Sequence, residues 1–286
     1  GGMSSVINQL MEHDWGNNIE ITYLSTHISG HIITKCFYFF KSYLHLFMLS
    51  IQNTYDIIHI HMSYKGSFIR KNSIAHLSKK FSKKVIVHLH GSEFKDYYNQ
   101  SSYKNKVKIQ KFFSLVDVTI VLGNDWNDFI RRIAPRANIV VVNNAIKIPE
   151  YHIQIRHTPF TLLFLGVLIE RKGVFDLLKA IKSIIKQSYN IKLYIAGTGL
   201  KEKEMREYCL NNGLKDNVEF LGWVSNAKKE KVFLNSDLLV LPSYNEGLPI
   251  AILEALSYGL PIISTNVGSI SDAVINKRNG LLISPG

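Results

Sequence analysis

The stretch Tyr244-Asn245-Glu246-Gly247-Leu248-Pro249-Ile250-Ala251-Ile252-Leu253-Glu254-Ala255 places two carboxylates on either side of a predicted strand-to-helix corner. The apolar run 238–241 just before it predicts a short strand that is buried on both faces of a sheet. Pro249 suits the first turn of a helix, because an N–H group there would have no partner within the helix. We expect this helix to turn four apolar side chains toward the core, those of Ile250, Leu253, Ala255 and Leu256.

The same corner has the chemistry of a nucleotide-sugar site. Glu246 is predicted on the turn, and Glu254 one to two turns into the helix. The free N–H groups at a helix start attract anionic phosphate, and nearby carboxylates accept hydrogen bonds from sugar and ribose hydroxyls. The alternative interpretation is that each carboxylate only compensates the helix dipole.

Short apolar strands alternate with helix-length segments along the chain, which predicts parallel βαβ units. The predicted helices include 65–80, 174–187 and 200–212, and the predicted strands are 19–24, 57–61, 85–90, 118–122, 139–142, 162–165, 192–196, 218–221, 238–241 and 261–264. A polar segment near Pro149 and Pro159 has no period and predicts a linker at 149–158, between domains 1–148 and 159–286. Ligands bind outside the carboxyl ends of such strands, so two facing sheets would share one cleft.

The two-carboxylate motif resembles the E-x7-E signature of family 4 of the glycosyltransferases, the retaining GT-B type. Further segments resemble the family's other motifs, in its order and spacing across nearly the whole chain: Gly1-Gly2-Met3, His88-Leu89-His90-Gly91-Ser92, Leu165–Val174, Tyr194–Gly199 and Leu221–Val224. The resemblance implies an α/β fold with two Rossmann-like, doubly wound parallel-sheet domains that face each other across a cleft. It also implies sugar transfer from a nucleotide-diphosphate sugar, with UDP as the expected nucleotide, and neither metal nor other cofactor.

The resemblance assigns roles to individual residues. Lys172 would neutralise the diphosphate, Glu246 and His90 would contact the donor sugar, and Glu254 would accept hydrogen bonds from the ribose. The remaining donor-side residues would be Gly2, Gly166, Arg171, Gly199, Trp223, Val224, Gly247, Leu248 and Pro249. Val167 stands where the family usually has an arginine, and Arg171 or backbone N–H groups would have to compensate. We expect Gly1 and Gly2 to form a tight loop that opens a helix over 3–11. The alternatives are that Lys172 is a surface lysine, that Trp223 is a core aromatic and that Gly1-Gly2 is a tag remnant.

Two His-x-His pairs, His59/His61 and His88/His90, lie on strands that we expect to be neighbours. Alternation places each pair on one face of its strand, and four imidazoles at one edge have the chemistry of a zinc site. The family needs no metal, so the resemblance favours structural roles for His59, His61 and His88.

The chain carries a net charge of +12 and only two cysteines, Cys36 and Cys209, which fits a reducing cytoplasm. Its basic residues gather in the first half, and such a face attracts anionic membrane surfaces or phosphorylated acceptors; no nucleic-acid recognition motif accompanies them. The apolar segment 36–51 is interrupted by Lys41 and His45 and is too short for a confident membrane span. It is predicted either to rest on an anionic membrane or to pack against the N-terminal sheet. The alternative interpretation is that the basic residues form only a solvated surface and bind no anionic partner.

These observations predict a cytoplasmic glycosyltransferase, peripheral at the inner membrane face, that acts on a lipid-linked or growing surface glycan. Two other functions remain open: a nucleotide-sugar epimerase of the same fold, and a non-catalytic nucleotide- or carbohydrate-binding module. The chain opens directly on Gly1-Gly2 and stops at Ser284-Pro285-Gly286. From the resemblance we expect that a first strand and closing C-terminal helices are missing.

Overall fold

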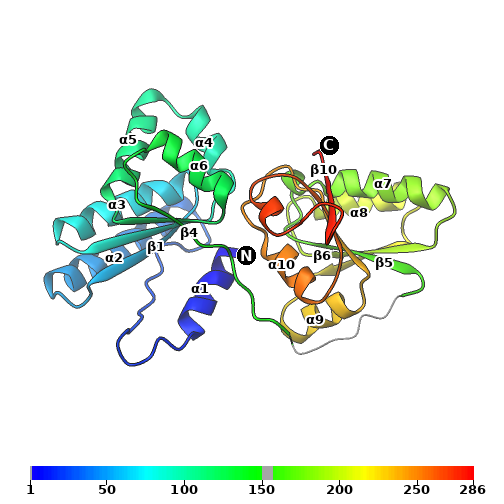
Figure 1. Ribbon diagram of the computed structural model, residues 1–286, viewed down its shortest axis with the longest axis horizontal. Coiled ribbons are helices and arrows are strands. Elements are labelled where there is room, and N and C mark those ends of the chain that lie inside the picture. Colours follow the sequence, from blue (N-terminus) through cyan, green and yellow to red (C-terminus); the bar gives the residue numbers. More distant parts are fainter. Residues whose placement is uncertain (1, 150–156) are drawn as a thin grey trace. The chain divides into compact units, whose positions relative to one another are not determined.

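The computed structural model describes residues 2–149 and 157–286, so most of the predicted linker lies outside the described residues. The chain forms two compact units, Gly1–Asn143 and Asn144–Gly286. Each unit is a parallel sheet with helices on it (Figure 1). The prediction of two parallel-sheet α/β domains is confirmed, but of the two sheets that the structure describes only the C-terminal one has the doubly wound strand order.

The N-terminal unit has a four-stranded sheet in which every neighbouring pair is parallel and the strands follow one another in chain order. The strands are β1 (Ile57–Met62), β2 (Lys84–Leu89), β3 (Val118–Val121) and β4 (Ile139–Val141). The helices are α1 (Gly2–Glu12), α2 (Ile32–Ile51), α3 (Gly66–Lys80), α4 (Phe94–Gln100), α5 (Tyr103–Leu115) and α6 (Asn124–Ile133).

Aromatic side chains from the helices fill the core of this unit. Phe68 of α3 packs edge-to-face on Phe112 of α5, with ring centroids 5.3 Å apart, and Phe94 packs in the same way on Phe113 at 5.7 Å. All four are at most 2% exposed. Burial of each such ring contributes roughly 1.5–3 kcal/mol, so these contacts hold α3, α4 and α5 together.

The predicted strand 19–24 is wrong. Its residues have no regular structure, and the alternating apolar side chains of Ile19, Ile21 and Tyr23 are exposed. An alternating pattern becomes a strand only where a neighbouring strand satisfies its backbone groups. Residues 19–24 pair with no strand of the two sheets that the structure describes. Among the described helices, none is long and apolar enough to cross a membrane.

The C-terminal unit has a six-stranded sheet in the order β10-β9-β8-β5-β6-β7, parallel throughout. Its strands are β5 (Phe160–Leu165), β6 (Ile191–Ala196), β7 (Val218–Gly222), β8 (Leu238–Leu241), β9 (Ile262–Thr265) and β10 (Gly280–Ile283), the last of which was not predicted. Its helices are α7 (Val174–Lys186), α8 (Glu202–Asn211), α9 (Asn226–Leu234) and α10 (Ile250–Ser257), with the 3-10 turns η1 (Glu170–Lys172) and η2 (Ile270–Asp272). This is the doubly wound order, and it reverses between β5 and β8.

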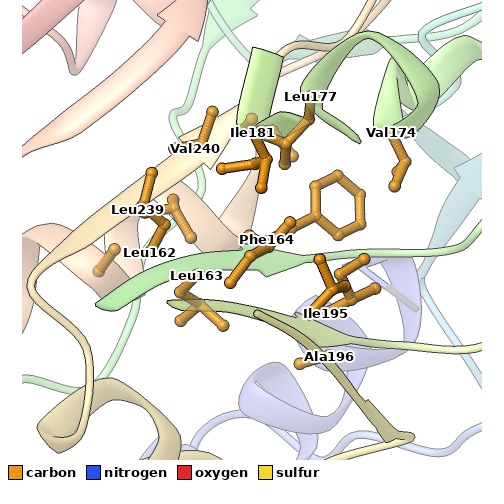
Figure 2. Packing of buried hydrophobic residues seen from close by; sticks show 14 of the residues in the cluster. Leu162, Leu163, Phe164, Val174, Leu177, Ile181, Ile195, Ala196, Leu239 and Val240 are labelled. Atoms are coloured by element: carbon orange, nitrogen blue, oxygen red, sulfur yellow. The ribbon is translucent and has the colours of Figure 1, made fainter. Parts of the chain in front are cut away.

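The core of this unit lies on both faces of the sheet, since α7 and α8 cover one face and α9 and α10 the other (Figure 1). Phe164 of β5 lies on the side of Val174 and Leu177 from α7, and the adjacent Leu163 points to the opposite side (Figure 2). Both are fully buried. A strand covered on both faces reads as a continuous apolar run, which explains why β5 and β8 were predicted well.

The phase of α10 differs from the prediction. The helix begins at Ile250 with Pro249 as its N-cap residue, and Ile252 and Ala255 are its buried residues. Ile250 and Leu253 are half-buried. Positions 252 and 255 share one helix face because they are three residues apart, and the helix start fixes that face toward the sheet.

Candidate functional site

The reversal of strand order in the C-terminal sheet defines a candidate site. At such a switch point the loops after the two adjoining strands run in opposite directions and open a crevice at their carboxyl ends. Here the loop after β5 carries Lys172, and the loop after β8 carries Glu246. The Lys172 ammonium donates to the Oε1 atom of Glu246 in a close ion pair, and the two side chains are 13% and 8% exposed.

Arg171 ties the same two loops together. Its Nη1 atom donates to the carbonyl of Asn245 at 2.9 Å, and its own carbonyl accepts from the N–H of Tyr244 at 2.8 Å. The tyrosine hydroxyl in turn donates to Asp176 on α7 at 2.7 Å. The turn that carries Glu246 is therefore held in place by η1 and the start of α7.

Two glycines allow backbone to approach this corner. Gly173 has φ 67°, and a Cβ atom there would lie 2.0 Å from the carbonyl oxygen of Pro242. Gly268, after β9, has φ 60°, and its Cβ would lie 2.2 Å from the carbonyl oxygen of Glu246. Only glycine suits both requirements. Gly268 was missed from the sequence, although its position just past a strand end at the same sheet edge was an available signal.

The second carboxylate also has a lysine partner. Glu254 on α10 forms a close ion pair with Lys229 on α9, and their side chains are 17% and 32% exposed. Lys229 was not predicted, because it comes from a different helix and belongs to no motif. Both carboxylates of the motif thus face ammonium groups in this structure.

Several other predicted donor-side residues lie around the same loops. A Cβ on Gly166 would lie 4.0 Å from Cε of Lys172, and one on Gly199 would lie 2.2 Å from the carbonyl oxygen of Leu168. Leu248 is buried, and its carbonyl accepts from the Asn144 amide at 2.7 Å. Gly247 accepts from the N–H of Ser269 at 2.9 Å, which fixes the turn before Pro249. Val167, 43% exposed, places no donor there.

Trp223 and Val224 lie after the edge strand β7, away from this corner along the sheet. They follow β7, which is separated from β5 by β6. Trp223 is 60% exposed, so the alternative of a core aromatic is wrong, whereas Val224 is buried. The structure brings Gly166, Arg171, Lys172, Glu246 and Gly247 together and leaves Trp223 further along the sheet edge.

In the N-terminal unit, the four histidines of the His-x-His pairs lie close together along β1 and β2: His59 is in the middle of β1, His61 and His88 are next to the last residue of their strands, and His90 directly follows β2. His61 is paired with His88 in the parallel register. The Nδ1 atom of His61 and the Nε2 atom of His90 are hydrogen-bonded at 2.8 Å, and the rings of His88 and His90 lie 4.0 Å apart. Gly91 lets the chain after β2 lie close to the chain after β1, since a Cβ there would lie 2.8 Å from Cα of Ser63.

Burial keeps these imidazoles neutral. It lowers the pKa of His90 to about 2, that of His61 to about 3 and that of His88 to about 4, with further lowering from the neighbouring rings. The pKa of His59 is lowered as well, because its ring stacks on those of His61 and His88 and is desolvated there, although the residue is still exposed to solvent. At neutral pH His90 is therefore an uncharged hydrogen-bonding group. Gly2 is the first residue of α1 rather than part of a loop, and Gly1 lies outside the described residues.

Residues 149–286 match the family model of the glycosyl transferases group 1. This match covers slightly less than half of the chain. Solved structures support the fold of the whole chain: sucrose-phosphate synthase from Thermosynechococcus elongatus superposes with a TM-score of 0.73 at 17% identity, covering 89% of this chain and 66% of that one. Anabaena Alr3699/HepE in complex with UDP gives 0.71 at 18% identity, covering 86% and 69%. The predicted GT-B fold class is confirmed.

The relatives of this chain include proteins named as glycosyltransferases. The chain is 32% identical to the uncharacterized glycosyltransferase MJ1607 of Methanocaldococcus jannaschii, over 43% of this chain and 32% of that protein. It is 26% identical to an uncharacterized 41.2 kDa protein in the cps region of Klebsiella pneumoniae, over 99% and 83%. It is 23% identical to the amylovoran biosynthesis glycosyltransferase AmsK of Erwinia amylovora, over 81% and 58%. The chain thus spans about a third of the first of these relatives and over half of the last.

Proposed function

We propose that this chain belongs to a retaining, family 4 glycosyltransferase that moves a sugar from a UDP-linked donor to a surface glycan. The observation that carries the proposal is the Lys172–Glu246 pair at the switch point of a group 1 domain. Sugar transfer builds negative charge on the leaving diphosphate, and a pre-positioned cation stabilises that charge. Lys172 supplies the cation.

Donor binding would exchange partners at this pair. A diphosphate competes with Glu246 for the Lys172 ammonium, and the released carboxylate then accepts hydrogen bonds from the sugar hydroxyls. The N–H groups of Gly247 and Leu248 serve as further donors at the start of α10. Arg171 already uses Nη1 to hold Asn245, so we assign it to positioning the turn rather than to replacing the arginine absent at Val167.

Glu254 would bind the ribose hydroxyls, with Lys229 orienting the carboxylate until the nucleotide arrives. The base would contact the backbone at Trp223 and Val224. The neutral His90 would hydrogen-bond the donor sugar, because an uncharged imidazole both donates and accepts. None of the motif residues is an obvious nucleophile, so we favour front-face substitution assisted by the leaving phosphate. The choice of UDP is supported by HepE, a fold neighbour whose structure is described in complex with UDP.

We further propose that the acceptor is lipid-linked or growing glycan at the inner face of the cytoplasmic membrane. Helix α2 supports this. Its buried residues, Ser42, Leu46 and Ser50, form a narrow stripe, so the helix packs on the unit through that stripe. Its broad apolar face is exposed instead, at Ile32, Ile33, Phe37, Phe40, Leu44, Met48 and Ile51. With Lys35 and Lys41 on the same helix, this face suits an anionic lipid surface.

The test is a panel of nucleotide sugars, with UDP release and product mass measured on the full-length protein and a lipid-linked acceptor. A glycosyltransferase releases UDP and adds one sugar mass to the acceptor. An epimerase changes the sugar and releases no UDP, and a binding module binds UDP without turnover. Either of the last two results would overturn the proposal. Flotation with anionic and neutral liposomes at low salt tests the membrane part, which fails if both vesicles bind equally or neither binds.

A further inference from the structure

Three histidines of the N-terminal unit are arranged as a set of metal ligands. His59 and His61 are two residues apart on β1, and His88 is the register partner of His61 on β2, so all three side chains lie on one face of the sheet. One ring nitrogen from each lies within 4.8 Å of the others. A tetrahedral zinc with Zn–N bonds of about 2.05 Å needs nitrogens about 3.3 Å apart, so modest rotations of the rings bring them into range.

His88 lacks the partners that a buried imidazole normally has. Its side chain is 5% exposed, and neither ring nitrogen is hydrogen-bonded to any residue that the structure describes. A buried polar group without a partner is unfavourable. A metal ion satisfies such a nitrogen, and the exposed ring of His59 gives an ion access from solvent.

The protonation state suits ligation. Metal binding requires the neutral imidazole, and burial lowers the pKa of His61 to about 3 and that of His88 to about 4. The ammonium of Lys71 lowers the pKa of His61 further by charge repulsion, and it donates a hydrogen bond to the hydroxyl of Thr26 at 2.6 Å.

His90 completes the arrangement as an outer partner. Histidine ligands usually give their second ring N–H to a hydrogen-bond acceptor, which fixes the tautomer of the ligand. In this structure Nδ1 of His61 lies 2.8 Å from Nε2 of His90. One nitrogen of His61 is thus held by His90, and the other remains for a ligand.

We propose that His59, His61 and His88 bind a zinc-type divalent cation on one face of β1 and β2, with His90 as the outer partner of His61. Three imidazoles without a carboxylate favour zinc and its neighbours over magnesium or calcium, which prefer oxygen ligands. The site goes beyond the proposed sugar transfer, which uses Lys172 rather than a metal.

The test is a titration of the untagged, chelator-treated protein with Zn²⁺ by calorimetry and with Co²⁺ by visible absorption. We expect one ion per chain, tetrahedral Co²⁺ bands and no competition from Mg²⁺. His59→Asn should weaken zinc binding at least about tenfold, because the loss of even an outer-shell partner costs about 10–100-fold in metal affinity. The matched control is His76→Asn, because His76 is exposed on α3 and lies outside the cluster; it should leave the affinity unchanged.

His59 is exposed, so its substitution is expected to preserve the fold, and thermal unfolding of both variants checks this. His88→Asn is a second variant, scored only if its melting curve is native-like. Wild-type protein that binds no zinc, or His59→Asn protein that binds zinc as tightly as wild type, would overturn the site. UDP affinity measured on the same samples reports on the proposed transferase function separately.

Discussion

The carboxyl-end edges of the two sheets occupy equivalent positions in their units. They differ in their side chains, which are charged at one edge and uncharged at the other. In the C-terminal unit the edge holds lysine–carboxylate pairs, Lys172–Glu246 and Lys229–Glu254. In the N-terminal unit it holds neutral imidazoles, and the carboxylate pairing of Lys79 with Asp117 occurs instead beside the first residues of β2 and β3. The position on a parallel sheet determines where a ligand binds, and the side chains determine which ligand.

The largest expected effect comes from the C-terminal pair. Lys172→Ala removes the cation for the leaving diphosphate and leaves Glu246 buried without its partner. We expect kcat/KM for sugar transfer to fall about 10²–10³-fold, the loss typical of one removed electrostatic stabiliser. Lys186→Ala at the end of α7 is the control, since that residue is exposed. Activity of folded Lys172→Ala protein close to that of the control would contradict the assignment.

The second carboxylate should matter for nucleotide binding rather than for the chemical step. Glu254→Ala removes charge-assisted hydrogen bonds to the ribose and should weaken UDP binding by roughly 1–3 kcal/mol. Calorimetry measures this directly, with Glu207→Ala on α8 as an exposed-carboxylate control. Unchanged UDP affinity would remove Glu254 from the site.

The close backbone approach at Glu246 can be separated from backbone strain. Gly268 and Gly213 have similar φ values, 60° and 68°, but a Cβ at Gly213 meets nothing within 4 Å. Alanine costs strain at both positions, and at Gly268 it also displaces the carbonyl of Glu246. We expect Gly268→Ala to lower the free energy of unfolding about 1–2 kcal/mol more than Gly213→Ala, as measured by urea denaturation. Equal losses would mean that the turn carrying Glu246 shifts to accommodate the added methyl group at little cost in free energy.

These positions show what the sequence can and cannot predict. The strand Leu238–Leu241 was predicted with its observed bounds, because an apolar run covered on both faces is a local signal. The Lys229–Glu254 pair joins two helices and depends on sheet order, which no local period encodes. The failed strand 19–24 has the right alternation but no neighbouring strand. The strand β10 was overlooked because a four-residue strand that begins with a glycine gives little signal.

The N-terminal unit offers a charge pair that should serve stability alone. Burial raises the pKa of Asp117, but hydrogen bonds from Lys79, the N–H of Val85 and Lys84 outweigh it and lower the pKa to about 2. Because the folded pKa lies below the unfolded one, the stabilisation is complete above about pH 4 and is lost as pH falls toward 2.

Asp117→Asn should therefore reduce the free energy of unfolding by about 1 kcal/mol at pH 6, and the difference from wild type should shrink below pH 4. Urea denaturation at several pH values measures it, with exposed Asp216→Asn as the control. A difference that does not vary with pH would assign the effect to packing instead of charge.

The smallest expected effect is that of a chelator on turnover, and it tests the contrast between the two edges most directly. If Lys172 and the N–H groups of the α10 start neutralise the diphosphate, sugar transfer needs no divalent ion, and excess EDTA should leave kcat unchanged. The same treatment strips any zinc from the histidines of β1 and β2, so unchanged activity also separates that site from the transfer reaction. Loss of turnover that manganese or magnesium restores would show that the C-terminal edge works through a metal and that the role of Lys172 was misassigned. Loss that only zinc restores would instead place the N-terminal histidines in the reaction and remove the division of chemistry between the two sheets.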